Sequence, residues 1–506
     1  MKLFRISSFV TLLLIHSFTN ATVSSYFDSI KNQPNALYSF LKNMPKGGEL
    51  HYHLAGGAYP ETMLALAAQG DYCLDKKTMT MTKMVEQRCR DVSGKELSNY
   101  PELYAQTIRA WSLKDFIEGQ ESNHDHFFAS FYKFMPLVAD YRPQLLAEIM
   151  QRAASQHELY LEIMILPDNA KSTQFSPSTI SPDLFSRAQQ QLLENPDFIK
   201  NIEYTGKEAS RILKQARQDL DCSTNPQQDV CRIKVKFQYY ILREQPIEKV
   251  FAQALNGFAV AERSEDIVGV NLVQAEDGII SLRDYRQQMQ VFNFLHEAYP
   301  KVHIALHAGE LAPPAVVPEN LRFHIRDAIT IGQAERIGHG VDIAFENDAE
   351  KLFQIMAQKG TAVEINLISN QKLLHISGSQ HPLNDYLNHK VPVVLSTDDE
   401  GLLRTDLTQQ YVEATLKHGL DYPRLKMISR NAITYSFLPG QSIWANANQG
   451  LPVESCIELD SPACRLFIKK NEKARLQRVL EKEFRGFENL YNSSQAQEAP
   501  LREVTH

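Results

Sequence analysis

Short apolar runs recur eight times along the chain from residue 49 onward, and a segment long enough for a helix separates each run from the next. Such runs predict β-strands, whereas the intervening segments 282–299 and 346–360 carry apolar residues at the three- and four-residue spacing of amphipathic helices. The predicted strands are 49–56, 160–166, 233–241, 268–273, 302–309, 336–343, 362–369 and 392–399. Eightfold alternation favours an α/β fold, a (β/α)8 TIM barrel whose active site lies at the C-terminal ends of its strands.

Two regions depart from this alternation. Residues 60–158 are too long for an ordinary crossover, so we expect an insertion after the first strand that covers the barrel mouth. Helical patterns after residue 400 predict extra C-terminal helices that close the same domain. The expected organisation is one barrel domain over 22–490, followed by a disordered tail at 491–506.

The first 21 residues have the character of a cleaved export signal. Lys2 and Arg5 precede an apolar run at 9–18, and a small-residue site follows at Ala21. A run of about ten residues is too short to cross a bilayer, which takes about 20. No later stretch is long and apolar enough, so we expect an exported protein, periplasmic or secreted, without a membrane span.

Six cysteines fall into three local couples, and proximity pairs them as Cys73 with Cys89, Cys222 with Cys231 and Cys456 with Cys464. An even count in an exported chain favours disulfides, although 15 connectivities are formally available. No C-x-x-C pair is present, which argues against a cysteine zinc site and against the zinc site of cytidine-type deaminases.

The formal net charge of -7 offers no broad basic surface for a phosphate backbone. We therefore expect a small-molecule partner and no nucleic acid. Oligomeric state is left open, with a homodimer as one option.

Metal-binding side chains recur at the ends of four predicted strands. His51 and His53 share one face of the first strand, because residues i and i+2 of a strand point the same way. His307 ends the fifth strand, His339 the sixth and Asp398 the eighth. Three imidazoles and a carboxylate that converge at a barrel rim predict one Zn²⁺ site with an open position for water.

Each of these residues also has a purely structural explanation. His307 alone could be a core histidine, and Asp398 with Asp399 could form a turn or a helix cap. His303 is expected at the barrel bottom, and a second H-x-H at 123–126 precedes an amphipathic helix and is left out of the ligand set. A two-metal centre of this barrel class normally uses a lysine on the fourth strand, and the run 268–277 has none, so one metal is expected.

A zinc site needs partners for catalysis. Zinc lowers the pKa of its bound water to about 7, and His339 is the candidate base or orienting group for the resulting hydroxide. Glu310 can donate a proton if an apolar setting raises its pKa, and could otherwise cap the next segment at the surface. Asp399 could orient the water or bind substrate.

The segments "MPKGGELHYHLAGG", "HAGE", "ERIGHGVD" and "STDDE" resemble, in this order and spacing, the adenosine deaminase family. The likeness runs from Met44 to Phe437. The export signal, the cysteines and "NLVQAED" are most similar to the secreted, growth-factor-related adenosine deaminases. The resemblance implies zinc-dependent hydrolytic deamination at C6 of a purine nucleoside, with ammonia as the released product.

Carried over by motif, the resemblance makes His51, His53, His307 and Asp398 the zinc ligands. It further implies that Glu310 protonates purine N1, that His339 orients the attacking hydroxide, and that Asp399 contacts N7 and the water.

The base side of the site is assigned to Gly309, Asp399 and Gln274. Gln274 departs from the family pattern, because it stands where the family has a glycine near purine N3. Ala55 departs as well, because it replaces an aspartate near the ribose 5′-hydroxyl. Both changes leave open a substrate other than adenosine. Two alternatives also stay open: an amidohydrolase acting on another cyclic C–N bond, and an exported binding or signalling protein with weak activity.

Overall fold

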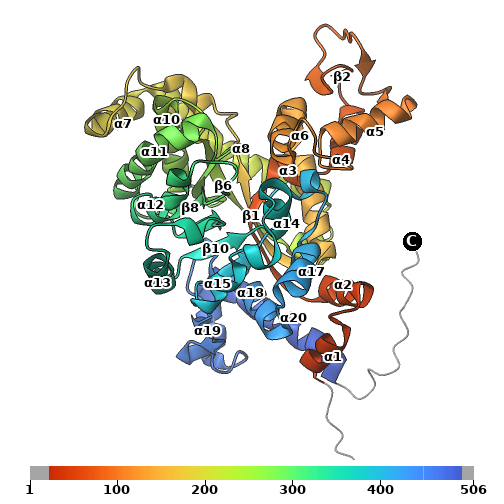
Figure 1. The fold of residues 1–506 in the computed structure, drawn as a ribbon, viewed down its shortest axis with the longest axis vertical. Helices are drawn as coiled ribbons and strands as arrows, with labels where there is room; N and C mark the ends of the chain where they lie inside the picture. The colour runs from red at the N-terminus through yellow and green to blue at the C-terminus, as the bar shows by residue number, and fades with distance from the viewer. Residues whose placement is uncertain (1–21, 448, 493–506) are drawn as a thin grey trace, which may run out of the picture.

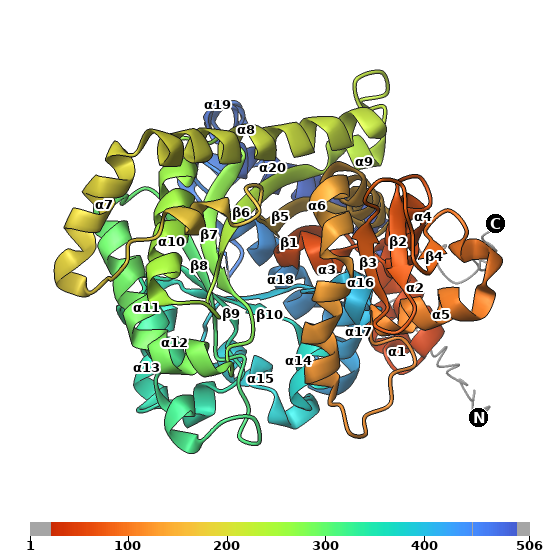
Figure 2. The ribbon, with the colours of Figure 1, turned by 90° about the horizontal axis from the view of Figure 1, so that it is seen from above.

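Eight parallel strands form a ring in the computed structural model, which describes residues 22–447 and 449–492. The strands follow one another around the ring in chain order, with helices outside them (Figure 2). The predicted (β/α)8 barrel is therefore confirmed. The strands are β1 (Lys46–His53), β5 (Glu158–Ile165), β6 (Lys234–Leu242), β7 (Ile267–Val273), β8 (His303–Ala308), β9 (Arg336–His339), β10 (Ala362–Ile365) and β11 (Val393–Leu395).

The ring closes between its first and last strands at the C-terminal rim. The His53 backbone N–H donates to the Asp398 carbonyl at 3.1 Å, and the Asp398 N–H donates to the His51 carbonyl at 3.2 Å. This parallel bridge joins the end of β1 to the segment that follows β11. Three of the predicted ligands are thus held together by backbone hydrogen bonds alone.

Helices cover the outside of the ring because each presents an apolar stripe to the strands. In α11 (Ile279–Ala298), Tyr285, Met289 and Phe292 recur at helical spacing and are fully buried. The other covering helices are α6 (Asn123–Ser155), α8 (Pro196–Asp219), α10 (Ile247–Ala261), α12 (His324–Thr330), α13 (Ala349–Lys359), α15 (Leu383–Asn388), α17 (Leu407–His418) and α18 (Tyr422–Thr434).

Short helices at the rim replace the last residues of two predicted strands. The apolar run at 362–369 divides into β10 and α14 (Leu367–Leu374), and the run at 49–56 divides into β1 and α3 (Leu54–Gly57). In the run at 392–399 the strand β11 ends at Leu395, and α16 (Glu400–Leu403) begins only after the run. The predicted strands are too long at this end because buried rim helices are as apolar as strands.

The insertion after β1 has two parts. A three-stranded antiparallel sheet projects away from the barrel (Figure 1). The second part reaches the rim, where Glu118 pairs with His375 after α14 at 3.3 Å and His124 pairs with Asp277 after β7 at 3.2 Å. Cover of the whole mouth stays a prediction. The remaining elements of the insertion are α4 (Pro60–Ala67), β2 (Tyr72–Asp75), β3 (Thr80–Lys83), β4 (Val92–Ser93) and α5 (Pro101–Ala110).

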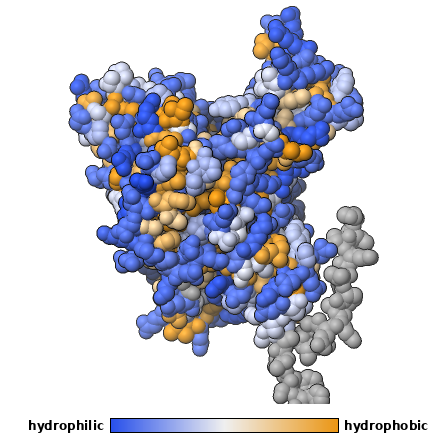
Figure 3. Space-filling model, viewed as in Figure 1, coloured by the Kyte–Doolittle hydropathy of each residue, from blue (hydrophilic) through white to orange (hydrophobic). Residues whose placement is uncertain are grey.

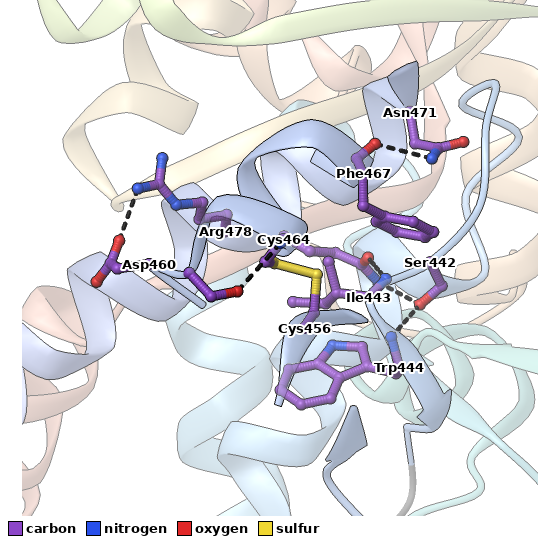
Figure 4. Close-up of a disulfide and its surroundings, with 11 residues drawn as sticks. Ser442, Ile443, Trp444, Cys456, Asp460, Cys464, Phe467, Asn471 and Arg478 are labelled. Atoms are coloured by element: carbon purple, nitrogen blue, oxygen red, sulfur yellow. Dashed lines mark hydrogen bonds and ion pairs between the residues drawn. A yellow bond between two sulfur atoms is a disulfide. The ribbon is translucent and has the colours of Figure 1, made fainter. Parts of the chain in front are cut away.

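The C-terminal region adds the predicted helices and one small extra core. In this core the Cys456–Cys464 disulfide packs with Ile443 and Ile468, beside Trp444 (Figure 4). The helix α20 (Glu472–Asn492) runs two residues into the tail predicted at 491–506, and the rest of that tail lies outside the described residues. Further elements are α1 (Val23–Ile30), α2 (Pro34–Asn43), α7 (Phe185–Glu194), α9 (Asp229–Arg232), β12 (Trp444–Asn446), β13 (Leu451–Pro452) and α19 (Pro462–Lys470).

All three predicted disulfides are present, and none of the six cysteines is free. They join Cys73 to Cys89, Cys222 to Cys231 and Cys456 to Cys464. Disulfides persist in oxidising compartments, which agrees with an extracytoplasmic setting. The predicted export signal at 1–21 lies outside the described residues.

The outer surface is mostly hydrophilic in the view of Figure 3, with apolar side chains gathered between the lobe that carries α7 and the lobe that carries β2. Among the described residues, we find no helix with the length and apolar character that crossing a bilayer requires.

Candidate metal centre

Four side chains from distant parts of the chain converge at the rim. His51, His53, His307 and Asp398 each offer one ligand atom, and these four atoms lie within 4.8 Å of one another. His53 Nε2 is 3.2 Å from His307 Nε2 and 3.3 Å from Asp398 Oδ1. Both histidine nitrogens and the carboxylate therefore face one point, as the sequence predicted.

His51 is oriented by a carboxylate beneath it. Its Nδ1 lies 2.7 Å from Glu364 Oε2 on β10, so the Nδ1 proton points at Glu364 and Nε2 points at the cluster. His51 Nε2 is buried and has no hydrogen-bond partner. A buried ring nitrogen without a hydrogen-bond partner is costly, and a metal ion would satisfy it.

The charge around His51 favours a cation. Burial lowers the pKa of His51, but the nearby carboxylates of Asp398 and Glu364 outweigh burial and raise that pKa to about 10. The two carboxylates thus draw a positive charge to this position. A metal ion at Nε2 would take the place of that proton.

His307 is oriented in the same way by an amide. Its Nδ1 donates to Asn271 Oδ1 on β7 at 2.9 Å, which leaves Nε2 free to bind. Burial, followed by the neighbouring histidines, lowers the pKa of His307 well below its usual value. His307 is therefore neutral, as a ligand must be.

Asp398 is held by its backbone and by one hydroxyl. It has a left-handed backbone, with φ of +66°, in the segment that closes the ring. Its Oδ2 accepts from Ser369 Oγ at 2.8 Å, while Oδ1 faces His51 and His53. Three nitrogens and one carboxylate oxygen are a ligand set that suits Zn²⁺.

Glu310 faces the cluster from the turn after β8. Its backbone N–H and that of Gly309 both donate to the Glu276 carboxylate, at 2.8 and 3.0 Å. Gly309 has φ of +76°, a conformation that glycine adopts without strain. Burial, with Asp398 and Glu276 nearby, raises the pKa of Glu310 to about 8, so this carboxyl keeps its proton at neutral pH.

His339 ends β9 and lies beside Glu310. Its Nε2 is 3.7 Å from Glu310 Oε1 and 4.0 Å from Asp398 Oδ2. Its Nδ1 faces Asn370 of α14 at 2.9 Å. Burial lowers the pKa of His339 to about 3, which makes it a neutral imidazole. Glu310, His339 and Asp398 can themselves bring ligand atoms within 4.8 Å of one another.

Asp399 is buried behind the ligands and is not one of the clustered atoms. A Cβ on Gly56 would lie 1.8 Å from Asp399 Oδ1, so only glycine fits at position 56. Burial and the adjacent Asp398 raise the pKa of Asp399 well above its usual value. A carboxyl that keeps its proton can donate a hydrogen bond, and the role of Asp399 toward water or substrate stays a prediction.

The residues assigned to the base side lie on the same rim. Gln274 directly follows β7 and has φ of +86°, a conformation natural for the glycine it replaces. Its Oε1 accepts from the Glu244 N–H at 2.9 Å. Ala55 lies half-buried in α3, next to Gly56.

The histidines that were left out of the ligand set lie elsewhere. His303 stands at the start of β8, stacks on Phe437 and pairs with Glu335, which confirms its place at the barrel bottom. His124 pairs with Asp277. His126 donates from Nε2 to the backbone carbonyl of Arg109, and its Nδ1 faces Glu121.

Five supporting residues escaped sequence analysis, namely Asn271, Glu276, Glu364, Ser369 and Asn370. Asn271 and Glu364 are single polar residues inside apolar strands, and that isolation is the one feature that could have revealed them.

The barrel and its rim cluster together define the class of metal-site (β/α)8 barrels.

The model of the adenosine deaminase family matches residues 110–444, about two thirds of the chain. The chain belongs to this family, as the resemblance implied.

Curated relatives match over a shorter stretch. The chain is 34% identical over 140 residues to an adenosine deaminase of Klebsiella pneumoniae and 31% identical over 140 residues to one of Escherichia coli. Each match covers 28% of this chain and spans 39% of the relative.

Solved structures share the fold over most of the chain. An adenine deaminase from Arthrobacter aurescens superposes with a TM-score of 0.52 and 16% identity, covering 87% of this chain and 98% of that one. The Arabidopsis protein ADAL, solved in complex with IMP, superposes with a TM-score of 0.54 and 18% identity, covering 89% of this chain and 99% of that one.

Proposed function

We propose that this protein is a zinc-dependent hydrolytic deaminase of a 6-aminopurine nucleoside or a close relative. The observation that carries this proposal is the combination of three imidazoles and Asp398 at one point with a protonated Glu310 beside them. A hydrolase of an aromatic amine needs a nucleophile at the carbon and an acid at the ring nitrogen, and this arrangement can supply both.

His51, His53, His307 and Asp398 would hold the zinc ion. When bound, zinc makes a nucleophile available at neutral pH by lowering the pKa of water from 15.7 to about 7. His51 and His307 are already oriented for this role by Glu364 and Asn271.

Glu310 would protonate purine N1 from its neutral carboxyl. That proton draws electrons from C6, so the water-derived oxygen can add there. His339, whose Nε2 is 3.7 Å from Glu310 Oε1, would hold the attacking oxygen in line with C6. Asp399, protonated by burial, would donate a hydrogen bond to purine N7. The products are ammonia and the 6-oxopurine.

We further propose that the substrate is not adenosine itself, or that the protein binds adenosine through contacts other than those of the family. Ala55 cannot accept a hydrogen bond from a ribose 5′-hydroxyl. A lost hydrogen bond between a carboxylate and a buried hydroxyl costs about 1.5 to 3 kcal/mol of recognition. A modified ribose, a deoxynucleoside or a modified adenine would suit this pocket, and Gln274 would set the fit along the base edge.

We further propose that the chain acts after export, in the periplasm or outside the cell, because all six cysteines are paired. Zinc as the resident metal, the homodimer and the closer likeness to the secreted branch of the family stay predictions.

The test is ammonia release by the purified full chain, loaded with zinc, from adenine nucleosides, 2′-deoxynucleosides and nucleotides. Cyclic amides are assayed in parallel by chromatography of the ring-opened product, because opening the ring leaves the nitrogen on that product and releases no ammonia. Ammonia from one or more aminopurines is the expected result. Ring opening of a cyclic amide without ammonia from any aminopurine would favour the alternative amidohydrolase function, and no ammonia from any aminopurine would overturn the proposal. An Asp398→Asn variant, which loses a ligand, is the control for contaminating deaminase.

A further inference from the structure

Three side chains form a hydrogen-bonded series, the relay, from the α14–α15 connection to the rim. His381 follows the 3-10 turn η6 (Gly378–Gln380), Asn370 lies in α14, and His339 ends β9. His381 Nε2 is 3.1 Å from Asn370 Oδ1, and Asn370 Nδ2 is 2.9 Å from His339 Nδ1. All three residues are buried. Asn370 and His381 take no part in the proposed chemistry so far.

The donor-to-acceptor direction of the relay is set at His381. The Leu383 backbone N–H lies 3.1 Å from His381 Nδ1. A backbone N–H can only donate, so His381 Nδ1 must accept and the ring proton must sit on Nε2. His381 Nε2–H therefore donates to Asn370, and the group that it meets must be the amide oxygen.

The orientation of the Asn370 amide then fixes the hydrogen-bond direction at His339. Because the oxygen of Asn370 faces His381, its NH₂ group faces His339. An amide NH₂ can only donate, so His339 Nδ1 must accept and cannot carry a proton. The one remaining place for the ring proton of His339 is Nε2. Asn366 Nδ2 is 3.4 Å from His339 Nε2 and 3.5 Å from Nδ1, nearly equidistant from the two ring nitrogens, so it does not select between them. The shorter 2.9 Å contact of Asn370 with Nδ1 decides the tautomer.

We propose that Asn370 and His381 are positioning residues that fix His339 as the tautomer with its proton on Nε2. His339 then presents a hydrogen-bond donor to the side where Glu310 and Asp398 lie, at 3.7 and 4.0 Å. A donor there holds the attacking oxygen by its lone pair, whereas the other tautomer would offer a base. This inference rests on the proposed function for its catalytic meaning, but the tautomer itself does not.

The decisive measurement is ¹⁵N NMR of the full chain labelled in its histidine rings, because protonated and unprotonated ring nitrogens resonate far apart. The signals that disappear in a His339→Gln variant identify His339. We expect its Nδ1 to be unprotonated and its Nε2 protonated, in both metal-free and zinc-loaded protein. Protonated Nδ1 in the wild-type protein would overturn the proposal, whether or not any substrate is turned over.

Two matched variants test the relay. Asn370→Asp replaces the NH₂ donor with an acceptor of the same shape, so the His339 proton should move to Nδ1 and kcat should fall at least about 100-fold, with KM changed little. Asn388→Asp makes the same substitution at an exposed position of α15 and is the matched control, in which the tautomer and kcat should stay within about threefold of wild type. An unchanged tautomer and kcat in Asn370→Asp would contradict the relay. Absence of deaminase activity with the expected tautomer would overturn the proposed function and leave the relay intact.

Discussion

Glu364 Oε2 lies 2.7 Å from His51 Nδ1 at the base of the predicted metal site. The other oxygen of Glu364 accepts from Arg336 at 2.6 Å, and Arg336 is in turn paired with Glu162. All of these groups are buried inside the barrel. Glu364 therefore links the orientation of a ligand to a fixed ion-pair network in the core, and the rim cannot rearrange without breaking that network.

Replacing Glu364 with Gln should weaken zinc binding by about 10- to 100-fold. The amide can still accept from His51, but the negative charge that draws a cation to Nε2 is lost. Competition with a chromogenic zinc chelator measures the change. Glu350→Gln, an exposed glutamate on α13, is the matched control and should bind zinc like wild type. Wild-type affinity in Glu364→Gln would contradict this role.

Glu310→Gln should retain bound zinc and lose at least about 100-fold in kcat, because the amide has no proton to give to the ring. Steady-state ammonia release and zinc content by metal analysis give the two readouts. Glu319→Gln, an exposed residue in the same segment, should leave both unchanged. Near-normal turnover in Glu310→Gln would remove Glu310 from the proton-donor role.

The pH profile of kcat/KM should fall on the alkaline side. Burial raises the pKa of Glu310 to about 8, so the carboxyl is protonated below this value and loses its proton above it. The acid form is the active one, so activity is sustained up to about pH 8 and declines beyond. A profile that rises steadily from pH 8 to about pH 9 would show that the ionised carboxylate is the active form.

The barrel, and the convergence of the four side chains at its rim, could be predicted because both depend on local pattern. Apolar runs mark the strands, and His51 with His53 share a face whatever the rest of the chain does. Strand ends could not be placed as well. Periodicity does not distinguish a buried strand from the short buried helix α14, so the run at 362–369 was assigned to one strand.

The groups that orient the ligands could not be predicted, because their partners are remote in sequence. His51 and Glu364 are 313 residues apart, and Asn271 reaches a ligand 36 residues away. Asn271 and Glu364 are each a lone polar residue in an apolar strand. The same pattern is typical of a core residue whose hydrogen bonds are satisfied. Only the closed ring shows which ligand each one meets.

Ala55→Asp should shift substrate preference toward nucleosides with a free 5′-hydroxyl. A carboxylate at the start of α3 can accept from that hydroxyl and repels a 5′-phosphate. We expect the ratio of kcat/KM for adenosine to that for adenosine 5′-phosphate to rise about tenfold, which corresponds to about 1.4 kcal/mol. Ala55→Asn, which adds the same volume without charge, is the control. An unchanged ratio in Ala55→Asp would place position 55 outside the sugar pocket.

The Cys456–Cys464 disulfide should stabilise the small C-terminal core without affecting catalysis. Its hydrophobic cluster, with Ile443 and Ile468, is separate from the barrel core. Closing a loop of 8 residues contributes about 2 to 3 kcal/mol. In a Cys456→Ala, Cys464→Ala double variant we expect faster amide hydrogen exchange at 443–474 and unchanged kcat. The Cys222→Ala, Cys231→Ala variant, whose disulfide lies beside α8, is the control for removing a disulfide elsewhere. Wild-type exchange throughout 443–474 would show that packing alone holds this core.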